Sequence, residues 1–399
     1  MKTLTFILLV LSLAETALWF VPISSELMWP AGMIVREIWP WAIAANVLGI
    51  LFAIFRWRWA ILVFAGGLAV TLWPLAQIRD LENDIADQWE HRGFSAASLH
   101  VPGTFGVLLR SFTDVDPVEP DIAPNTLRPD IYLYKSPDSV GLEPLPIVVN
   151  IHGGSWQHLD ASADARFTSH LATEGYAVFS IDYSKAPIYQ YPAQINDVRA
   201  AIDWIVANAP FYGADPTRIA VIGRSAGAQL ALLYSYTNEA IPIRGVVSLY
   251  GPTDLMEMHR NPPSPDPIDV RAKLEAYLGG TPDDVPAAYR DASPIAHLKA
   301  NLPPTLLIQG ARDHVVEPGF TEEMHQRLKE SGTRSVLIEL PWSDHSFDSV
   351  YFGPGNILAN AYIEAFLADI MPPNAQPIAE LSDTPPAQDL LRKDSSSSS

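Results

Sequence analysis

A serine near the middle of the chain has the surroundings of a nucleophile. Ser225 is the centre of a Gly-Arg-Ser-Ala-Gly segment at 223–227, between an apolar β-branched run at 219–222 and a helix-like run at 226–236. A turn of this kind between a strand and a helix strains the serine backbone, and the small flanking residues let neighbouring backbone pass close by. The hydroxyl is then exposed at the carboxyl end of a strand, within reach of a base and a substrate. The pentapeptide alone also fits an ordinary tight turn, so its interpretation depends on its partners.

The remaining parts of a charge-relay site follow in the expected order. A serine hydroxyl attacks well only when a base takes its proton and an acid orients that base. Asp313 and His345 each follow a strand-like apolar run, so both lie at strand carboxyl ends, on the same edge as Ser225. The order Ser, Asp, His is the order that accompanies a nucleophile elbow. The sequence therefore predicts Ser225 as nucleophile, His345 as base and Asp313 as orienting acid.

Other residues compete for these roles. An aspartate in a Gly-rich turn is often only a turn former, and Glu317 is the substitute acid. His314 is the substitute base, although its place beside Asp313 directs it elsewhere. Asp344 and Asp348 flank the predicted base, where they either tune its charge or are simply solvated.

An oxyanion also needs preorganised donors. Gly153 and Gly154 follow a strand-like run, in a turn where backbone N–H groups can face inward, and the N–H of Ala226 joins them. A flexible glycine turn is the plainer alternative. His152 is interpreted as a structural hydrogen-bonding residue, and no metal-binding motif accompanies it. The sequence predicts neither a metal nor a cofactor.

The body of the chain alternates between strands and helices. Continuous apolar strands separated by helices predict an α/β fold with a mostly parallel sheet covered on both faces. The predicted strands are 105–112, 131–134, 147–151, 177–181, 219–222, 246–249, 305–308 and 336–340, and the predicted helices are 80–92, 197–209, 226–236, 317–330 and 357–370.

These elements divide the chain into four predicted parts. Residues 1–80 form an apolar head, and 81–127 form a connecting segment with an exit helix and a first strand. Residues 128–371 form the catalytic domain, in which the Pro-rich and charged stretch 255–298 is a cap-like insertion. The Pro- and Ser-rich end, 372–399, is predicted to be disordered.

The head is predicted to lie in a membrane. Three apolar runs cover 4–23, 40–55 and 59–78, and seven of the eleven tryptophans lie in this part, mostly near the ends of the runs. The third run has no charged residue and is long enough to cross a bilayer. Two alternatives remain: a cleaved signal peptide for the first run, and buried helices of a soluble protein for the later runs.

Charge indicates both the class of partner and the orientation. The net charge is −19, of which residues 1–80 contribute +1 and the remainder −20, so a nucleic-acid partner is excluded. Arg56 and Arg58 form the only basic connection between runs and are expected to stay in the cytoplasm. Three spans then predict a multi-pass membrane protein whose body is extracytoplasmic. The chain has no cysteine, so it forms no disulfide.

At these motifs the body resembles the α/β-hydrolase superfamily, on the side of the hormone-sensitive-lipase-like esterases and closest to the bacterial feruloyl-esterase-like (BD-FAE) group. Kynurenine formamidases are related. The matching segments are His152–Gly154, Asp182–Pro187, Tyr191–Val198, Tyr212–Ile219, Tyr250–Leu255 and Tyr289–Pro294.

The resemblance implies an α/β-hydrolase fold, with Ser225, Asp313 and His345 as triad and the amides at Gly153, Gly154 and Ala226 as oxyanion hole. Three departures leave substrate preference open. Ser184-Lys185 replaces Arg-Leu, Ser346-Phe347 follows the histidine where Gly-Phe is common, and Arg224 precedes the nucleophile where small or acidic residues are frequent.

The sequence thus predicts a membrane-anchored serine hydrolase that cleaves carboxylic esters through an acyl-enzyme. Trp156 and the 255–298 insertion are candidates for lining the substrate pocket. An amidase or peptidase with the same triad is one alternative, because the triad does not specify the leaving group. A catalytically silent, membrane-tethered interaction protein on the same fold is the other.

Overall fold

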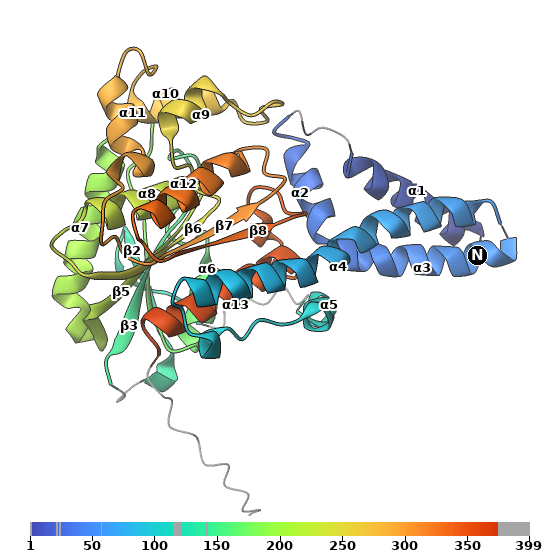
Figure 1. Ribbon diagram of the computed structural model, residues 1–399, viewed down its shortest axis with the longest axis horizontal. Helices are drawn as coiled ribbons and strands as arrows, with labels where there is room; N and C mark the ends of the chain where they lie inside the picture. The colour runs from blue at the N-terminus through green and yellow to red at the C-terminus, as the bar shows by residue number, and fades with distance from the viewer. Residues whose placement is uncertain are drawn as a thin grey trace, which may run out of the picture.

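A computed structural model describes residues 2–20, 23, 25–56, 58–114, 122–139 and 143–373. The predicted disordered end therefore lies almost entirely outside the described residues. Within them, a sheet with helices on both faces forms the body, and a helical arm projects from it (Figure 1).

The sheet has eight strands in the order β1-β2-β4-β3-β5-β6-β7-β8. β2 pairs antiparallel with both β1 and β4, and all the other neighbouring strands pair parallel. The central strands are buried along most of their length, as expected for near-continuous apolar runs covered on both faces. The strands are β1 (Asn125–Arg128), β2 (Ile131–Tyr134), β3 (Leu145–Ile151), β4 (Ala177–Ile181), β5 (Ala214–Arg224), β6 (Ile243–Leu249), β7 (Thr305–Gly310) and β8 (Ser335–Leu340). Every predicted strand from 131 onward is confirmed.

Two apolar cores lie on the two faces of this sheet. One contains side chains of α7 (Ala193–Asn208), α8 (Ala226–Thr237) and α12 (Pro318–Glu330). The other contains side chains of α6 (Ala165–Thr173), α13 (Pro354–Ile370) and the second half of α4 (Ala60–His91). Successive strand residues alternate between the cores, since adjacent side chains of a strand point to opposite faces.

The predicted insertion between β6 and β7 is helical. It contains α9 (Leu255–Arg260), α10 (Val270–Leu278) and α11 (Pro286–Ala292), which lie together at one end of the body (Figure 1). Its residues reach the space beside the predicted nucleophile, as described below.

The N-terminal region forms α1 (Lys2–Leu18), α2 (Trp29–Glu37), α3 (Trp39–Arg56) and α4. We call α1, α3 and residues 60–78 of α4 the apolar arm, because these helices extend together away from the body (Figure 1). The arm is packed internally: Oγ of Ser12 donates to Oδ1 of Asn46 at 2.7 Å, and a Cβ at Gly67 would collide with both side chains. Small residues and interhelical hydrogen bonds are the usual contacts between helices in a membrane.

Three predictions for this region need correction. By length and composition, one described helix, α4, is suited to cross a membrane, and α2 with α3 passes the same test only as a pair bent by 72°. At 17 residues, α1 is shorter than a usual span. The three straight spans are therefore not supported.

The predicted boundary at residue 80 falls inside α4, which runs unbroken to His91. Ile78, Leu81, Ile85 and Trp89 are buried along one stripe of that helix, so the apolar period of 3–4 residues crosses the boundary. The predicted exit helix at 80–92 is confirmed, and it continues the helix of the preceding apolar run without a break.

The predicted strand 105–112 is also wrong, because these residues form α5 (Thr104–Thr113). Val107 and Ser111 are buried four residues apart, whereas Phe105, Leu109 and Phe112 are exposed at helical spacing. A run that is apolar on several sides lacks the alternation that distinguishes a strand, and the helical period prevails.

Candidate active site

Ser225 lies at the turn between β5 and α8, as the sequence predicts. Its φ is 51° and its ψ is −120°, a strained conformation for a residue with a side chain. A Cβ at Gly223 would lie 2.2 Å from the carbonyl oxygen of Gly227, and a Cβ at Gly227 would lie 2.2 Å from that of Ile151. Both glycines are therefore required by close backbone approach, and the sharp turn projects the serine from the sheet edge.

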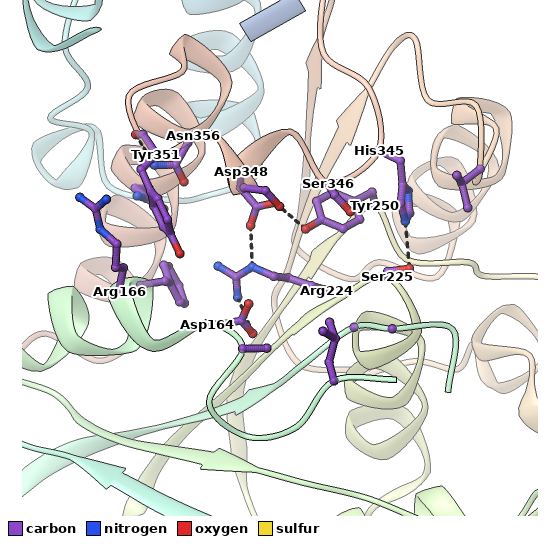
Figure 2. A pocket seen from close by; sticks show the side chains of 18 of the residues that line it. Asp164, Arg166, Arg224, Ser225, Tyr250, His345, Ser346, Asp348, Tyr351 and Asn356 are labelled. Atoms are coloured by element: carbon purple, nitrogen blue, oxygen red, sulfur yellow. Dashed lines mark hydrogen bonds and ion pairs between the residues drawn. The ribbon is translucent and has the colours of Figure 1, made fainter. Parts of the chain in front are cut away.

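The structure brings the three predicted catalytic residues together. Nε2 of His345 lies 2.9 Å from Oγ of Ser225 (Figure 2). Nδ1 of the same ring lies 2.8 Å from Oδ2 of Asp313. The loops after β5, β7 and β8 supply them, because parallel strands end at one edge. Both His345 and Asp313 are buried, so water screens their interaction little.

Asp313 is fixed by several donors. Its Oδ1 accepts the backbone N–H groups of Val315 and Val316, each at 2.8 Å, and its Oδ2 accepts Nε2 of Gln309 at 2.9 Å. These bonds leave Oδ2 directed at His345, as an orienting acid requires.

The competing candidates lie elsewhere. Nδ1 of His314 faces Asp344 at 2.9 Å rather than the serine, and Glu317 is exposed at the start of α12. Asp344 and Asp348 are both buried, so they are not the solvated neighbours considered as one alternative.

The predicted oxyanion-hole residues surround Ser225. A Cβ at Gly153 would lie 3.0 Å from the Arg224 carbonyl and 3.3 Å from Cβ of Ser225, so this glycine lies directly against the nucleophile. Gly154 has a φ of 107°, a conformation that favours glycine. Ala226 begins α8, where amides have no intrahelical acceptor. Within the described chain, the N–H groups of Gly153 and Gly154 have no recorded acceptor of their own.

A partly exposed network around the buried His152 holds the glycine turn. Nε2 of His152 lies 2.9 Å from Oδ1 of Asp182, and its Nδ1 lies 2.6 Å from the Gly153 carbonyl oxygen. Burial alone would raise the pKa of Asp182, but hydrogen bonds from His152, Lys185 and the N–H of Tyr183 lower it to about 2. His152 is thus a structural residue, and Lys185, one of the departures from the family pattern, completes its network.

Two spaces of different character adjoin Ser225. The smaller, about 20 Å³, is lined by apolar residues that include Trp156, Met258 and Leu274. The larger, about 750 Å³, extends past Arg224 and Asp348 toward Arg166, Tyr351 and Asn356, as Figure 2 shows. Its wall is rich in charged and amide side chains, so one side of the nucleophile suits a small apolar group and the other a larger polar group.

Trp156 lines the smaller space, where the sequence places a substrate-binding residue. Its ring stacks on Tyr277 with centroids 4.2 Å apart, and its Nε1 donates to Gln229 at 3.0 Å. The side chain is only 4% exposed, so its position is fixed by packing against its neighbours. Residues of the 255–298 insertion form the facing wall.

Known proteins are similar in sequence to this chain. The BD-FAE family matches residues 130–328. Esterase LipC of Mycobacterium tuberculosis (strain ATCC 25618 / H37Rv) is 33% identical over 220 residues, which are 52% of this chain and 54% of LipC. Esterase LipQ of the same strain is 28% identical over 268 residues, which are 62% of this chain and 60% of LipQ. The chain thus spans less than two thirds of these relatives' length.

Solved structures extend the comparison to the fold. The structure titled Bacterial Heroin Esterase superimposes with a TM-score of 0.56 at 24% identity, covering 66% of this chain and 89% of that one. The chain has the α/β-hydrolase fold. In this hydrolase fold the elbow serine, the Gly-Gly turn and the loops after β7 and β8 occupy the edge at which ligands bind in open α/β sheets.

Residues before the hydrolase fold also reach its cavity. Glu26 and Trp29 line the larger space, and the Trp29 ring centroid lies 5.8 Å from that of His345. Sequence reasoning assigned this segment to a membrane head and did not predict its part in the site. The available signal was a group of charged residues, Glu26, Arg36 and Glu37, between apolar runs.

Proposed function

We propose that this protein hydrolyses carboxylic esters by acyl transfer to Ser225. The observation that carries this proposal is the contact of the Ser225 hydroxyl with Nε2 of His345, whose Nδ1 faces the buried Asp313. Relatives named as esterases support the reaction class.

The geometry suits a two-step reaction. His345 takes the hydroxyl proton as Ser225 attacks the ester carbonyl, then gives it to the departing alcohol. The same imidazole activates water, which releases the acid from the acyl-enzyme. Asp313 keeps the imidazole oriented and stabilises its cationic form, while amides at Gly153, Gly154 and Ala226 stabilise the oxyanion.

The two spaces suggest which esters fit. A space of about 20 Å³ holds little more than one water-sized group, so the acyl side accepts a short chain. The larger polar space accommodates a bulkier alcohol that carries hydrogen-bonding groups. We infer a preference for short acyl chains on polar alcohols.

We also propose that the apolar arm attaches the enzyme to a membrane. The expected extracytoplasmic position of the body followed from three spans, which the structure does not support, so neither side of the membrane is assigned to the body. Large apolar side chains are exposed along the arm, among them Leu11, Leu48, Leu51 and Leu62, each at least 49% accessible. Exposed apolar surface on this scale indicates a partner surface, and the length of α4 suits a bilayer.

The decisive experiment uses full-length protein in detergent. A fluorophosphonate probe is expected to label Ser225, and hydrolysis of p-nitrophenyl acetate is expected to exceed that of the butyrate and decanoate. Ser225→Ala should lose labelling and turnover, with a loss on the order of 10⁴-fold or more. Comparison with p-nitroanilides tests the amidase alternative. A folded wild type that neither labels nor turns over any ester would refute the proposal in favour of a silent interaction protein.

A further inference from the structure

One carboxylate ties together the loops that carry the acid and the base. Asp344 is fully buried, and its Oδ1 accepts the backbone N–H groups of His345 at 2.8 Å and His314 at 3.1 Å. Because His314 directly follows Asp313 in the chain, the position of Asp344 affects both sides of the His345–Asp313 contact.

The charge that balances Asp344 comes from α2. Nη1 of Arg36 donates to Oδ2 of Asp344 at 2.5 Å, and neither side chain is more than 3% exposed. The pair is therefore little screened by water. Loss of Arg36 leaves the buried Asp344 carboxylate without its arginine counter-ion, with the His314 ring and the two backbone N–H groups as its remaining contacts. A helix outside the hydrolase fold thus completes the environment of the turn that holds His345.

The next residue of α2, Glu37, accepts a hydrogen bond from the turn that holds His345. Oε1 of Glu37 accepts the hydroxyl of Ser343 at 2.5 Å, and Oε2 accepts the N–H of Gly355 at 2.8 Å. A Cβ at Gly355 would lie 2.7 Å from Oγ of Ser343 and 2.8 Å from the Glu37 carboxylate oxygens, so glycine is needed there. The start of α13 and the histidine turn are both attached to α2.

The arm contacts the acid loop as well. Arg312, directly before the acid, lies with its guanidinium 5.5 Å from the ring centroid of Trp19 and 5.3 Å from that of Trp73. The N-terminal region therefore contacts both loops that meet at the nucleophile.

We propose that α2 is a positioning element of the active site. Arg36 and Glu37 act through Asp344 and Ser343 to hold His345 at hydrogen-bond distance from Ser225. The role rests on the proposed esterase function, because it concerns the base of that reaction. It makes the segment before the hydrolase fold part of the catalytic apparatus in addition to its place beside the arm.

If α2 positions His345, loss of its contacts should lower kcat and leave KM nearly unchanged. Full-length Arg36→Met and Arg36→Lys are compared with wild type on p-nitrophenyl acetate, normalised to the sites labelled by fluorophosphonate. Arg36→Met is expected to lower kcat by about 10- to 100-fold with KM within about 3-fold, because the cavity remains while the base moves. Arg36→Lys should restore most of kcat, since an ammonium can replace the single Nη1 contact.

Two further variants keep the test decisive. Ser343→Ala removes the hydrogen bond to Glu37 without removing a charge, and it is expected to lower kcat by about 3- to 10-fold. Arg327→Met is the matched control, because the Arg327 side chain pairs with Glu323 on the exposed face of α12. Wild-type kcat in both Arg36→Met and Ser343→Ala would overturn the proposal, as would a loss in Arg36→Met that lysine does not restore.

Hydrogen exchange provides a readout that does not depend on turnover. The amides of His345 and His314 should exchange faster in Arg36→Met than in Arg327→Met, because both donate to Asp344. Equal exchange would count against the proposal even if the wild type hydrolysed no ester. Activity of wild type with an inactive Ser225→Ala establishes the esterase function separately.

Discussion

Arg224, directly before the nucleophile, carries a buried positive charge and contacts residues from three parts of the fold. Nε of Arg224 donates to Asp348 at 2.6 Å, and its Nη1 lies 3.5 Å from Asp164 (Figure 2). The same Nη1 donates to Oδ1 of Asn150 at 3.1 Å. The hydroxyl of Tyr250 also donates to Asp348, at 2.5 Å. The unusual residue of the elbow motif is thus explained by its two carboxylate partners.

Arg224→Met is expected to lower the free energy of unfolding by about 3–5 kcal/mol, because it leaves Asp348 and Asp164 without their buried counter-ion. Chemical denaturation followed by tryptophan fluorescence measures the change. The control Arg327→Met removes an exposed pair and should cost about 1 kcal/mol or less. Equal stability of the two variants would show that Asp348 and Asp164 do not depend on Arg224.

A functional residue can be predicted from the sequence when its signal is local, and it cannot when its role depends on a partner far away in the chain. Ser225 and His345 stand in local patterns, directly after strand-like runs, so parallel-strand geometry brings them to one edge. Arg36 and Asp344 are 308 residues apart, and each alone resembles an ordinary surface charge. Only the folded chain shows that they form a buried pair.

Among the elements, the strands from 131 onward and the helix at 80–92 were predicted correctly, whereas the strand 105–112 and the boundary at residue 80 were wrong. Central strands are buried on both faces and separated by turn residues, so their apolar runs are short and distinct. In α5, and across residue 80 within α4, apolar and polar residues are mixed at a spacing of three or four. The partners of those helices, which decide how they fold, lie elsewhere in the sequence.

The attachment of α2 to the body is expected to depend on pH. Burial raises the pKa of the Glu37 carboxyl from 4.5 to about 8. Because the folded state holds the proton more tightly, this carboxyl favours folding fully below about pH 4.5, and that contribution is lost as pH rises to about 8. The unfolding free energy of wild type relative to Glu37→Gln should therefore fall by up to about 4 kcal/mol across this range.

Urea denaturation of both proteins in the same detergent at pH 5 and pH 8.5 measures this difference. Glutamine retains acceptor and donor groups near Ser343 and Gly355 but does not titrate, so it isolates the ionisation of Glu37. A difference between the two proteins that stays constant with pH would show that the carboxylate is accommodated at no cost.

At the scale of the whole molecule, charge and apolar surface are separated. The first 80 residues carry a net charge of +1 and the rest −20. The exposed large apolar side chains are concentrated on α1, α3 and α4. In the chain, α2 lies between α1 and α3, and its Arg36 and Glu37 contact the turn that holds His345. The arm is therefore connected to the active site through one short helix. A chain organised in this way holds its catalytic edge at a fixed position relative to the surface that binds the arm.

The last prediction concerns the attachment of the arm to a membrane. Leu48→Arg and Leu51→Arg together place two charges on the exposed side of α3, where each is about half accessible. In the interior of a bilayer each arginine costs about 2.5–3.5 kcal/mol, so the double variant should be released from vesicles by alkaline carbonate that leaves wild type bound. Ile188→Arg, at an exposed position on the body, is the matched control and should remain bound.

Hydrolysis of p-nitrophenyl acetate by the double variant in detergent should stay within about 3-fold of wild type, since neither leucine contacts the site. Release of the wild-type protein by carbonate would mean that the arm binds another apolar surface rather than the bilayer interior.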